Sequence, residues 1–348
     1  MTLSTDFERV SLPLADPFGL SRGTTDTADN VIVRIQDGDG NVGVGAAAPL
    51  EYYDETAASV EAAMPELLVA VEDVDDPHAQ QRLARILADR APDEASARAA
   101  VSVAVHDLAA RQQGEPLYRR WGLDPDAAPR TSCPIAIDSP ERMGEKAASA
   151  REAGYPILKV KVGTDDDRAR LAAVREAAPE ARLRVDANGA WTADDALDAM
   201  AWLAEYDVEF VEQPVAAADI DGLARVTSEG DLPVAADESC VTATDVPRVA
   251  DAVDIVVVKL DKCGGLRPAT RQIATANAHG LETMLGCMVS TNATIAGACH
   301  LAPLVDYADL DGSLLLADDP YDGLPIADGQ FDLSAVSAGT GATRKNRS

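Results

Sequence analysis

Lysine is the residue that this sequence of 348 residues most clearly lacks. Its 30 basic residues include six lysines, against 59 aspartates and glutamates. Four of the six lie in two apolar, strand-like runs, ILKVKVG and IVVVKLDKCGG: Lys159, Lys161, Lys259 and Lys262. A single strand lysine commonly reaches the sheet edge or pairs with a carboxylate, but this clustering favours a functional role. A buried lysine is costly unless it is paired, and its pKa moves readily, which suits a catalytic base.

The sequence also lacks the cysteine patterns and apolar runs that define several protein classes. Its five cysteines are scattered and form no CxxC pair, which argues against a disulfide framework and against a thiolate zinc site. No apolar run approaches ~18 residues, the length of a membrane span, and the first residues do not resemble a signal peptide. We therefore expect a cytoplasmic protein without a membrane partner.

Acidic residues dominate the charge. The net charge is −29 and the isoelectric point about 4.3, so nucleic acids and anionic membranes are poor partners. Abundant carboxylates with arginine in place of lysine are typical of a salt-loving organism, whose cytoplasm screens such repulsion because the Debye length falls to about 3 Å at 1 M salt. An ordinary acidic surface also fits the composition, but the depletion of lysine favours a halophilic protein.

From about residue 130 onward, short apolar runs recur at similar spacing and end in polar or glycine-rich segments. Between them lie alanine-rich segments with helical spacing, such as RARLAAVREAA. Eight such runs alternating with seven helices predict a (β/α)7β TIM-type barrel, because parallel strands need a helical crossover. The predicted strands are residues 132–137, 156–162, 182–187, 208–213, 232–238, 254–260, 281–287 and 307–311.

The first 125 residues show a different pattern. Two alternating runs, NVIVRIQD and NVGVGAAAP, flank the turn DGDG, which predicts a β-hairpin. Helical stretches are expected around 55–70, 78–90 and 94–113. We predict an α+β domain over residues 1–125, the barrel over residues 126–320, and a C-terminal return over residues 321–348 with a frayed, glycine-rich tail.

Polar side chains follow the predicted strands at the ends where barrel enzymes place their chemistry. A lone carboxylate there is most often a helix cap, but three on consecutive strands between two lysine-bearing strands are a stronger signal. The two lysines of the second strand are two residues apart and so share one face. In chain order, the strand-end residues are Lys159, Lys161, Asp186, Asn188, Glu212, Asp237, Glu238 and Lys259.

Three carboxylates without histidine or cysteine suit Mg²⁺, or alternatively Mn²⁺. The lysine-bearing strands flank them on both sides. This arrangement suits removal of a proton next to a substrate carboxylate: the metal neutralises the enediolate, and one lysine acts on each face. Lys159 would lower the pKa of Lys161 by like-charge repulsion. A Schiff-base aldolase would also use a strand-end lysine, but it would not need the carboxylates.

Through five motifs the chain resembles the enolase superfamily, and within it the muconate-lactonizing subgroup. The motifs are KVK (159–161), VDAN (185–188), EQP (212–214), ADES (236–239) and VKLDKCGG (258–265). The resemblance covers nearly the whole length and implies that the N-terminal domain, completed by the C-terminal segment, caps the barrel. It also implies a homo-oligomer.

The resemblance assigns roles to the strand-end residues. It implies that Asp186, Glu212 and Asp237 bind Mg²⁺ and that Lys161 and Lys259 are the acid/base pair. Lys159 is expected to assist catalysis, and the metal ligands are expected to be supported by two neighbours, Asn188 and Glu238.

The eighth strand narrows the expected activity. YADLDG places Asp309 and Asp311 two apart on one face, and the pattern resembles dipeptide epimerases, in which such a pair holds the substrate ammonium group. We therefore expect a Mg²⁺-dependent epimerase of L,L-dipeptides that acts by 1,1-proton transfer. A loop cap in an aspartate-rich chain stays possible for the pair. A muconate-type cycloisomerase or an o-succinylbenzoate synthase of the same superfamily stays open as the alternative activity.

Two further residues are candidate substrate contacts. Arg22, in PFGLSRGT, lies in a loop that binds an acidic substrate side chain in Ala-Glu epimerases, although a plain surface arginine fits as well. Ser290 follows GCM (286–288), where many epimerases have a Glu-Ser pair and this chain has Val289, Ser290 and Thr291. That departure leaves the particular dipeptide open.

Overall fold

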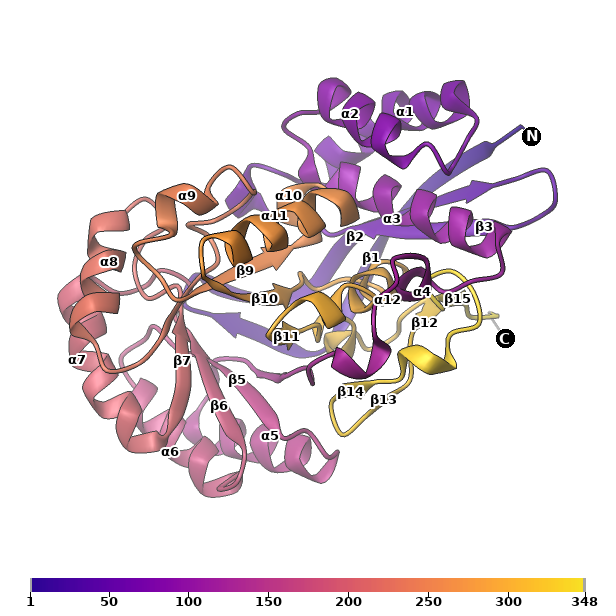
Figure 1. The fold of residues 1–348 in the computed structure, drawn as a ribbon. Helices are drawn as coiled ribbons and strands as arrows, with labels where there is room; N and C mark the ends of the chain where they lie inside the picture. The colour runs from indigo at the N-terminus through magenta and orange to yellow at the C-terminus, as the bar shows by residue number, and fades with distance from the viewer. Residues whose placement is uncertain (1, 347–348) are drawn as a thin grey trace.

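The computed structural model describes residues 2–346, and its centre is a barrel of eight parallel strands (Figure 1). The strands follow one another around the barrel in chain order, as the sequence predicts for a (β/α)7β barrel, and that prediction is confirmed. They are β4 (Cys133–Ile135), β5 (Ile157–Lys161), β6 (Arg182–Asp186), β7 (Val208–Glu212), β8 (Val234–Ala236), β9 (Ile255–Lys259), β10 (Glu282–Gly286) and β11 (Tyr307–Asp309).

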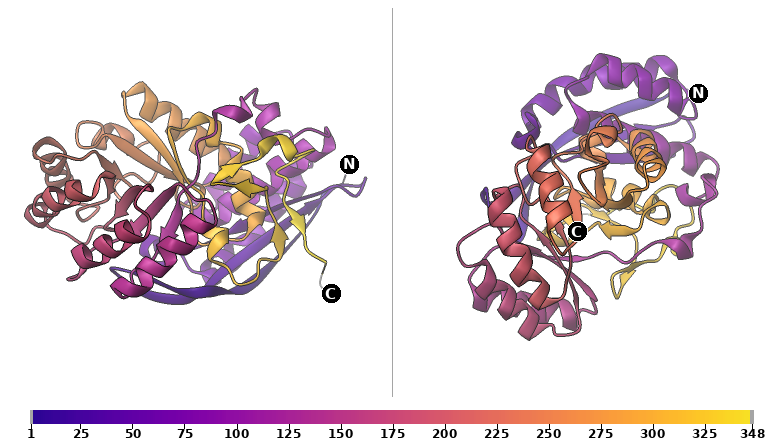
Figure 2. Two further views of the ribbon diagram at one scale, coloured as in Figure 1. Left: turned by 90° about the horizontal axis from the view of Figure 1, so that it is seen from below. Right: turned by 60° about the vertical axis from the view of Figure 1, so that its left-hand side comes forward.

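Helices connect the strands and cover the outside of the barrel (Figure 2). Several begin at capping side chains: Ser139 and Thr192, for example, accept hydrogen bonds from the N–H groups of the first turn. The helices are α5 (Pro140–Glu152), α6 (Asp167–Ala177), α7 (Ala193–Leu203), α8 (Ile220–Glu229), α9 (Val246–Val249), α10 (Leu260–Cys263), α11 (Leu266–Ala278) and α12 (Asn292–Cys299).

The ring of strands is nearly closed. Between β11 and β4 the contact is a parallel bridge from Thr131 to Ala308, where the N–H of Ser132 donates to the carbonyl of Ala308 (3.3 Å). Because closure at this point brings the last strand beside the first, side chains from β11 and β5 reach the same space at the mouth.

Alternate residues of each strand point into the barrel, and their lower layer is a packed floor. Arg184 is buried there, with its guanidinium carbon 5.2 Å from the ring centre of Phe210 and 5.0 Å from that of Tyr307. Its Nε donates to Glu209 (2.7 Å). This floor fills the lower barrel, so the side chains of the next layer up are held at the mouth.

The N-terminal part is an antiparallel sheet with helices on one face. Its strands are β1 (Ser4–Leu20), β2 (Gly23–Gln36) and β3 (Val42–Ala47), and its helices are α1 (Ala57–Val74), α2 (Gln80–Arg90), α3 (Ala95–Gln112) and α4 (Leu117–Arg120). The hairpin predicted around DGDG is confirmed as β2 and β3. The sequence did not predict β1, because Pro13 and Pro17 interrupt its pattern and the register shifts between Pro13 and Phe18.

Helix α3 lies directly on β3 because glycine faces it. A Cβ atom on Gly43 would lie 2.1 Å from the carbonyl oxygen of Ala104, and one on Gly45 would lie 2.1 Å from that of Ala100. The alanine-rich helix and the glycines of β3 thus pack backbone against backbone. This contact holds the sheet and α3 as one layer above the barrel.

The connection between β1 and β2 reaches over the barrel mouth. The N–H of Ile137 donates to the carbonyl of Gly19 (2.9 Å), and the hydroxyl of Ser21 donates to the carbonyl of Ala187 (3.3 Å). These bonds place the residues around 18–22 beside the ends of the barrel strands. The N-terminal domain therefore forms part of the wall around the mouth.

The C-terminal segment returns to the N-terminal domain. It contains the short strands β12 (Tyr321–Asp322), β13 (Ile326–Ala327), β14 (Gln330–Phe331) and β15 (Thr343–Arg344). Thr340 donates to the buried carboxylate of Asp107 on α3, and β15 pairs with β12. The tail that we predicted to be frayed is therefore paired up to Lys345, because its polar groups find partners on α3 and β12; its last two residues lie outside the described part of the chain.

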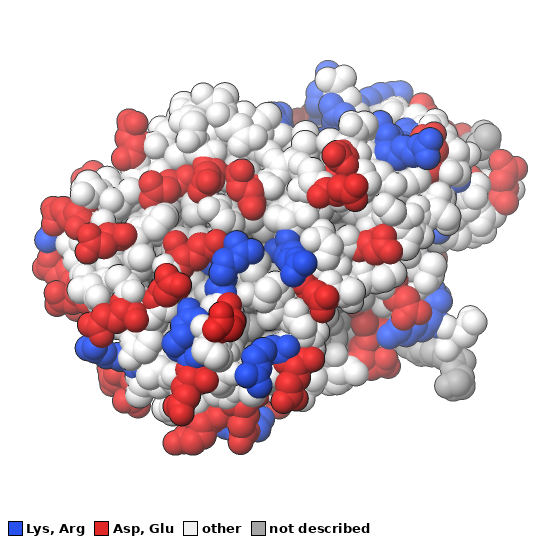
Figure 3. Space-filling model, turned by 60° about the horizontal axis from the view of Figure 1, so that its bottom comes forward, with Lys and Arg blue, Asp and Glu red and all other residues white. Residues whose placement is uncertain are grey.

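The surface carries the negative charge of the sequence. Figure 3 shows carboxylates spread across one face, with lysine and arginine side chains interspersed among them. Within residues 2–346, no helix combines the length and hydropathy that crossing a bilayer requires.

This charge predicts a salt-dependent stability. Raising KCl from about 0.1 to 1 M shortens the Debye length from roughly 10 to 3 Å and screens the repulsion among carboxylates. We expect the free energy of unfolding, measured by urea titration, to rise by at least ~1 kcal/mol over this range. A midpoint that is unchanged or lower in 1 M KCl would show that self-repulsion does not limit this fold.

Candidate active site at the barrel mouth

The upper layer of the barrel brings the predicted residues together from neighbouring strands. Lys161 ends β5 and lies in register with Asp186 at the end of β6, which lies in register with Glu212 at the end of β7. Asp237 directly follows β8, and Lys259 ends β9. In a ring of eight strands, β5 and β9 are four positions apart, so the two lysines approach from opposite sides.

Two of these strands end in unusual turns that hold the carboxylates at the mouth. Asn188 and Gln213, each shortly after a strand-end carboxylate, have left-handed backbone conformations with φ of 46° and 39°. The N–H of Asn188 donates to Asp186 Oδ1 (2.9 Å). The side-chain oxygen of Gln213 accepts the N–H groups of Asp237 and Ser239, both at 3.0 Å. Gln213 therefore ties the end of β7 to the end of β8.

Lysine ammonium groups lie among the carboxylates on the β5 side. Lys159 is buried, and its Nζ lies 2.6 Å from Asp309 Oδ2, 2.8 Å from Glu212 Oε2 and 3.3 Å from Asp186 Oδ2. Lys161 Nζ donates to Asp186 Oδ2 (2.6 Å). Burial opposes the charged form of Lys159, but these carboxylates raise its pKa well above the ordinary value. Lys159 is thus a fixed cation in this structure.

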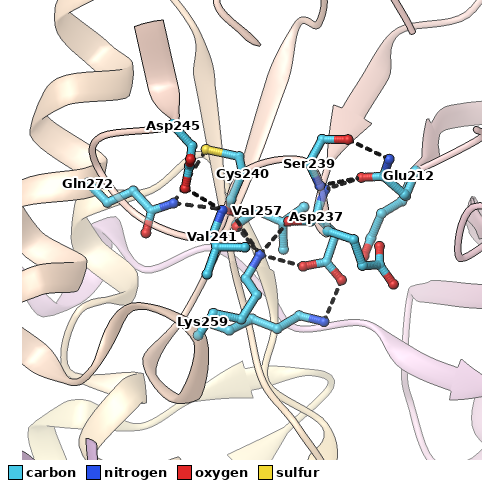
Figure 4. Close-up of polar contacts among 12 residues, drawn as sticks. Glu212, Asp237, Ser239, Cys240, Val241, Asp245, Val257, Lys259 and Gln272 are labelled. Atoms are coloured by element: carbon cyan, nitrogen blue, oxygen red, sulfur yellow. Dashed lines mark hydrogen bonds and ion pairs between the residues drawn. The ribbon is translucent and has the colours of Figure 1, made fainter. Parts of the chain in front are cut away.

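On the β9 side, Asp237 receives two lysines. Lys259 Nζ donates to its Oδ2 (2.7 Å), and Figure 4 shows Glu212, Asp237 and Lys259 gathered at one place. Lys262 Nζ donates to Asp237 Oδ1 (2.5 Å) and to the backbone carbonyls of Asp237, Cys240 and Val257. Lys262 belongs to the lysine cluster of the sequence, but no role was predicted for it. Because these contacts use the N–H donors of its ammonium group, Lys262 holds Asp237 in place.

The same contacts set the ionisation of the ligand candidates. Burial alone would raise the pKa of Asp186 and of Asp237, yet the neighbouring lysines hold both well below the ordinary value. For Glu212, burial and then the charge of Asp186 raise the pKa to about 8, despite Lys159. Both carboxylate oxygens of Glu212 are buried and accept no hydrogen bond from the described residues. Among the three, Glu212 is the one least satisfied by the protein itself.

These three carboxylates fit a hard divalent cation by their chemistry. All donors are oxygens on adjacent strands, and the buried Glu212 oxygens need a cationic partner beyond Lys159. Within residues 2–346, however, no three acidic, histidine or cysteine side chains converge closely enough to hold an ion in the arrangement shown. In this arrangement Asp186 is paired with Lys161 of β5, and Asp237 is paired with Lys259 of β9. The metal role of Asp186, Glu212 and Asp237 therefore stays a prediction.

The aspartate pair of β11 lies at the same mouth, but its members differ. Asp309 accepts from Ser132 and pairs with Lys159, which lowers its pKa to about 2 against the effect of burial. Asp311 is buried, and its carboxylate accepts a hydrogen bond from the thiol of Cys287, with Sγ 3.6 Å from Oδ1. Burial and the adjacent Asp309 raise the pKa of Asp311 to about 8. Asp311 is thus the member that lacks a direct cationic partner in the described residues.

Arg22 and the two predicted supporting residues form a group of their own. Arg22 Nη2 donates to Glu238 Oε1 (2.8 Å), and its guanidinium carbon lies 4.2 Å from the ring centre of Tyr52. Asn188 Nδ2 donates to the same oxygen of Glu238 (3.3 Å). The N-terminal loop is thereby tied to the ends of β6 and β8, and Arg22 reaches the mouth already paired.

Ser290, which we predicted to contact the substrate, does not line the cavity in this structure. It is fully buried, and its hydroxyl donates to Asn30 Oδ1 (3.1 Å), while Val289 and Met288 beside it line the cavity. The N–H of Thr291 donates to the same Asn30 oxygen (3.0 Å). Because this polar contact fastens the loop to β2, Ser290 is turned away from the cavity in this structure.

The cavity between these groups has a volume of about 130 Å³. Its charged lower wall holds Lys161, Lys259, Asp237 and Asp311. Its upper wall comes from the N-terminal domain and two loops of the barrel. This wall is mostly apolar, with Phe18, Leu20, Leu50, Tyr53, Val289 and Leu315, but it also carries Arg22 and Thr25. A small organic ion with apolar substituents matches this division.

Three contributors to the site were missed by sequence reasoning. Gln213 accepts the backbone N–H of Asp237, while Ser132 and Cys287 donate to the carboxylates of Asp309 and Asp311. Gln213 belongs to the motif EQP, so the sequence contained a local pattern that could have indicated its role. Ser132 and Cys287 contact aspartates of a distant segment, and no local sequence pattern indicates those contacts.

Comparison with protein families matches both parts of the chain. Residues 4–122 match the N-terminal domain of mandelate racemase and muconate lactonizing enzyme, and residues 142–347 match the enolase C-terminal domain-like family. These matches cover more than half of the chain and agree with the two parts of the fold.

Similar proteins span nearly the whole chain. An L-Ala-D/L-amino acid epimerase from Pedosphaera parvula is 37% identical over 332 residues, which are 93% of this chain and 94% of that protein. A hydrophobic dipeptide epimerase from Roseobacter litoralis is 37% identical over 94% of this chain and 95% of its own. The crystal structure of a dipeptide epimerase from Enterococcus faecalis with Mg and the dipeptide L-Leu-L-Tyr matches with a TM-score of 0.92 and 32% identity, over 99% of this chain and 100% of that chain.

The barrel and the capping sheet agree with this similarity along the full length. The chain belongs to the mandelate racemase and muconate lactonizing enzyme family of the enolase superfamily.

Proposed function

We propose that this protein is a Mg²⁺-dependent epimerase of L,L-dipeptides that works by 1,1-proton transfer through an enediolate. The observation that carries the proposal is the pair Lys161 and Lys259, on strands four positions apart, which line one cavity together with the β11 aspartates. Relatives at 37% identity are epimerases of L-Ala-D/L-amino acids and of hydrophobic dipeptides.

The two lysines account for inversion. One removes the proton from the α-carbon, and the other delivers a proton to the opposite face, so the configuration changes. Each lysine forms an ion pair with one strand-end carboxylate: Lys161 pairs with Asp186, and Lys259 pairs with Asp237. Those contacts orient both ammonium groups toward the centre of the mouth.

Asp186, Glu212 and Asp237 would hold the metal. Mg²⁺, or Mn²⁺ in its place, supplies positive charge that stabilises negative charge developing on the substrate carboxylate. Lys262 and Gln213 would hold Asp237 in position, and burial excludes competing water from Glu212.

Asp311 would bind the ammonium group of the dipeptide. Sequence analysis gave the pair equal roles, but Asp309 is engaged by Lys159 and Ser132, and Asp311 is not. A buried carboxylate with a pKa of about 8 gains most from an added cation, because pairing favours its ionised form. A cycloisomerase or a synthase acting on an anionic acid has no use for this carboxylate.

The mostly apolar upper wall favours substrates with uncharged side chains. Arg22, which we predicted to bind an acidic side chain, is engaged by Glu238 and Tyr52. Only one of its N–H donors is given to Glu238, so an acidic substrate side chain would compete with this contact for the orientation of the guanidinium while its other donors stay open to it. The proposal also places the enzyme in a reducing, salt-rich cytoplasm as a homo-oligomer; its free cysteines and its acidic composition support the compartment.

Glu212→Gln tests the metal site. Mg²⁺ binding should raise the thermal midpoint of the wild type in proportion to ln(1 + [Mg²⁺]/Kd), and the variant should lose this shift. Without metal, the variant should be at least as stable as the wild type at pH 8. The sign follows from the raised pKa of Glu212: the unfolded state ionises first, so this group costs stability as pH rises from its ordinary range toward about 8.

Glu205→Gln, an exposed change elsewhere in the barrel, should keep the full Mg²⁺ shift. A shift that survives in Glu212→Gln would remove Glu212 from the metal site.

Variants of the two lysines test the proton transfer. Lys161→Ala and Lys259→Ala should each abolish epimerisation. We expect kcat to fall by roughly 1,000-fold or more, which is the size of effect that loss of a general base or acid produces. In D₂O, each single variant should still exchange the α-proton of one epimer, on the face of the remaining lysine. Lys146→Ala, a lysine on α5 paired with Asp138, is the matched control and should retain activity. Inversion by the double variant would refute the mechanism.

Asp311→Asn tests recognition of the amine. We expect kcat/KM for dipeptides to fall roughly 10- to 100-fold, because a charged hydrogen bond is worth about 1.5–3 kcal/mol. At pH 7, dipeptide binding to the wild type should also release a proton, since Asp311 with its raised pKa must ionise to pair with the ammonium. Calorimetry in two buffers of different ionisation enthalpy measures that proton, with an equilibrated mixture of epimers as the titrant.

N-acetylated dipeptides should release no proton and should be poor substrates. If the wild type instead prefers them, the pair does not read an amine, and the cycloisomerase or synthase activity becomes the better assignment.

A further inference from the structure

A second cavity lies away from the barrel mouth, where the N-terminal domain meets the outer face of the barrel. It has a volume of about 760 Å³, within the range of small-molecule sites. Its walls are faces of α2, α3 and α11, and the loop at residues 242–244 closes one side. Nothing in the proposed epimerase reaction uses it.

The lining of this cavity is cationic in a strongly anionic protein. Four arginines line it, Arg85, Arg98, Arg267 and Arg271, and the lining contains no aspartate or glutamate. Across the part of the chain that the structure describes, none of the four has a carboxylate oxygen within 4.0 Å. By contrast, Arg225 on the barrel surface lies between Asp194 and Glu229.

Helical spacing brings the arginines to one place. Arg267 and Arg271 are one turn apart on α11, so both face the cavity. Arg85 lies on α2 and Arg98 on α3, the neighbouring walls. Like charges one turn apart repel, so the arrangement costs stability unless an anion offsets it.

Arg98 is the innermost of the four and is held by uncharged groups. Its Nη1 donates to the carbonyls of Ala91 and Pro92. Its guanidinium packs on Gly264, where a Cβ atom would lie 2.9 Å from Nε. Glu55, Asp93 and Glu94 act on it from farther away, and none of them forms an ion pair with it in the described residues. Glu55 is engaged by the backbone N–H groups of Ala95 and Ser96. The charge of Arg98 is thus left for the cavity.

We propose that this cavity binds a small polyanion, a molecule with two or more carboxylate or phosphate groups. Guanidinium groups bind both kinds of oxyanion through paired N–H donors. A single charge would not suffice, because the net charge of −29 repels anions and salt screens exposed contacts. Four arginines on three walls match an anion with several charged groups.

The proposal is tested by calorimetric titration of the full chain with pyrophosphate and with citrate, which separate phosphate from carboxylate ligands. The protein is first freed of metal on a chelating resin, because phosphates bind Mg²⁺ and a soluble chelator is itself a polyanion. We expect at least one probe to bind with a Kd below about 1 mM in 0.1 M KCl, and inorganic phosphate to bind more weakly.

Arg267→Gln with Arg271→Gln should raise that Kd at least tenfold, and circular dichroism should show an unchanged fold because both side chains are exposed. Arg225→Gln, an exposed but ion-paired arginine, is the matched control and should bind like the wild type. The proposal is overturned if neither probe binds with a Kd below about 1 mM, if binding survives the double variant, or if the variant changes only self-association, which would make the cavity a contact between acidic copies of this chain.

Discussion

The structure of the mouth depends on buried ammonium groups placed among a larger number of buried carboxylates. Lys159 and Lys262 are the fixed members: one bridges Asp309, Glu212 and Asp186, and the other binds Asp237 and three backbone carbonyls. Removing charges from water is expensive, so each such group must be matched. Strand ends, turns and the capping loop are all arranged so that this matching is geometrically possible.

The matching is incomplete at Glu212 and Asp311, where the proposed reaction needs cations. Glu238 also has one buried oxygen without a partner in the described residues, but its other oxygen accepts from Arg22. Glu212 and Asp311 both have pKa values of about 8, because burial and a neighbouring carboxylate outweigh the lysines within reach. A divalent ion would satisfy the first, and the ammonium group of a dipeptide would satisfy the second. Substrate and cofactor would therefore complete an electrostatic balance that the chain leaves open.

Much of this could be predicted from the sequence, because strand periodicity and strand-end polarity are local signals. The barrel strands, the β2–β3 hairpin and the layer of Lys161, Asp186 and Glu212 follow from them. Contacts between distant segments could not be predicted. The prolines of β1 interrupt its strand pattern. The C-terminal tail is held by a hydrogen bond from Thr340 to Asp107 of α3. The hydroxyl of Ser290 donates to Asn30, which is distant in the sequence. Which lysine pairs with which carboxylate depends on side-chain packing between strands that are distant in the sequence, so no local sequence pattern predicts it.

The central claim, inversion of a dipeptide α-carbon at a site completed by a metal, is tested most directly on the wild type in D₂O. A library of L,L-dipeptides is incubated with Mg²⁺ in concentrated KCl and followed by mass and by chiral separation. The account predicts a gain of one mass unit at a single α-carbon, appearing together with the L,D product and lost when Mg²⁺ is chelated. Exchange without inversion, inversion that survives chelation, or no reaction with any free-amine dipeptide would contradict it.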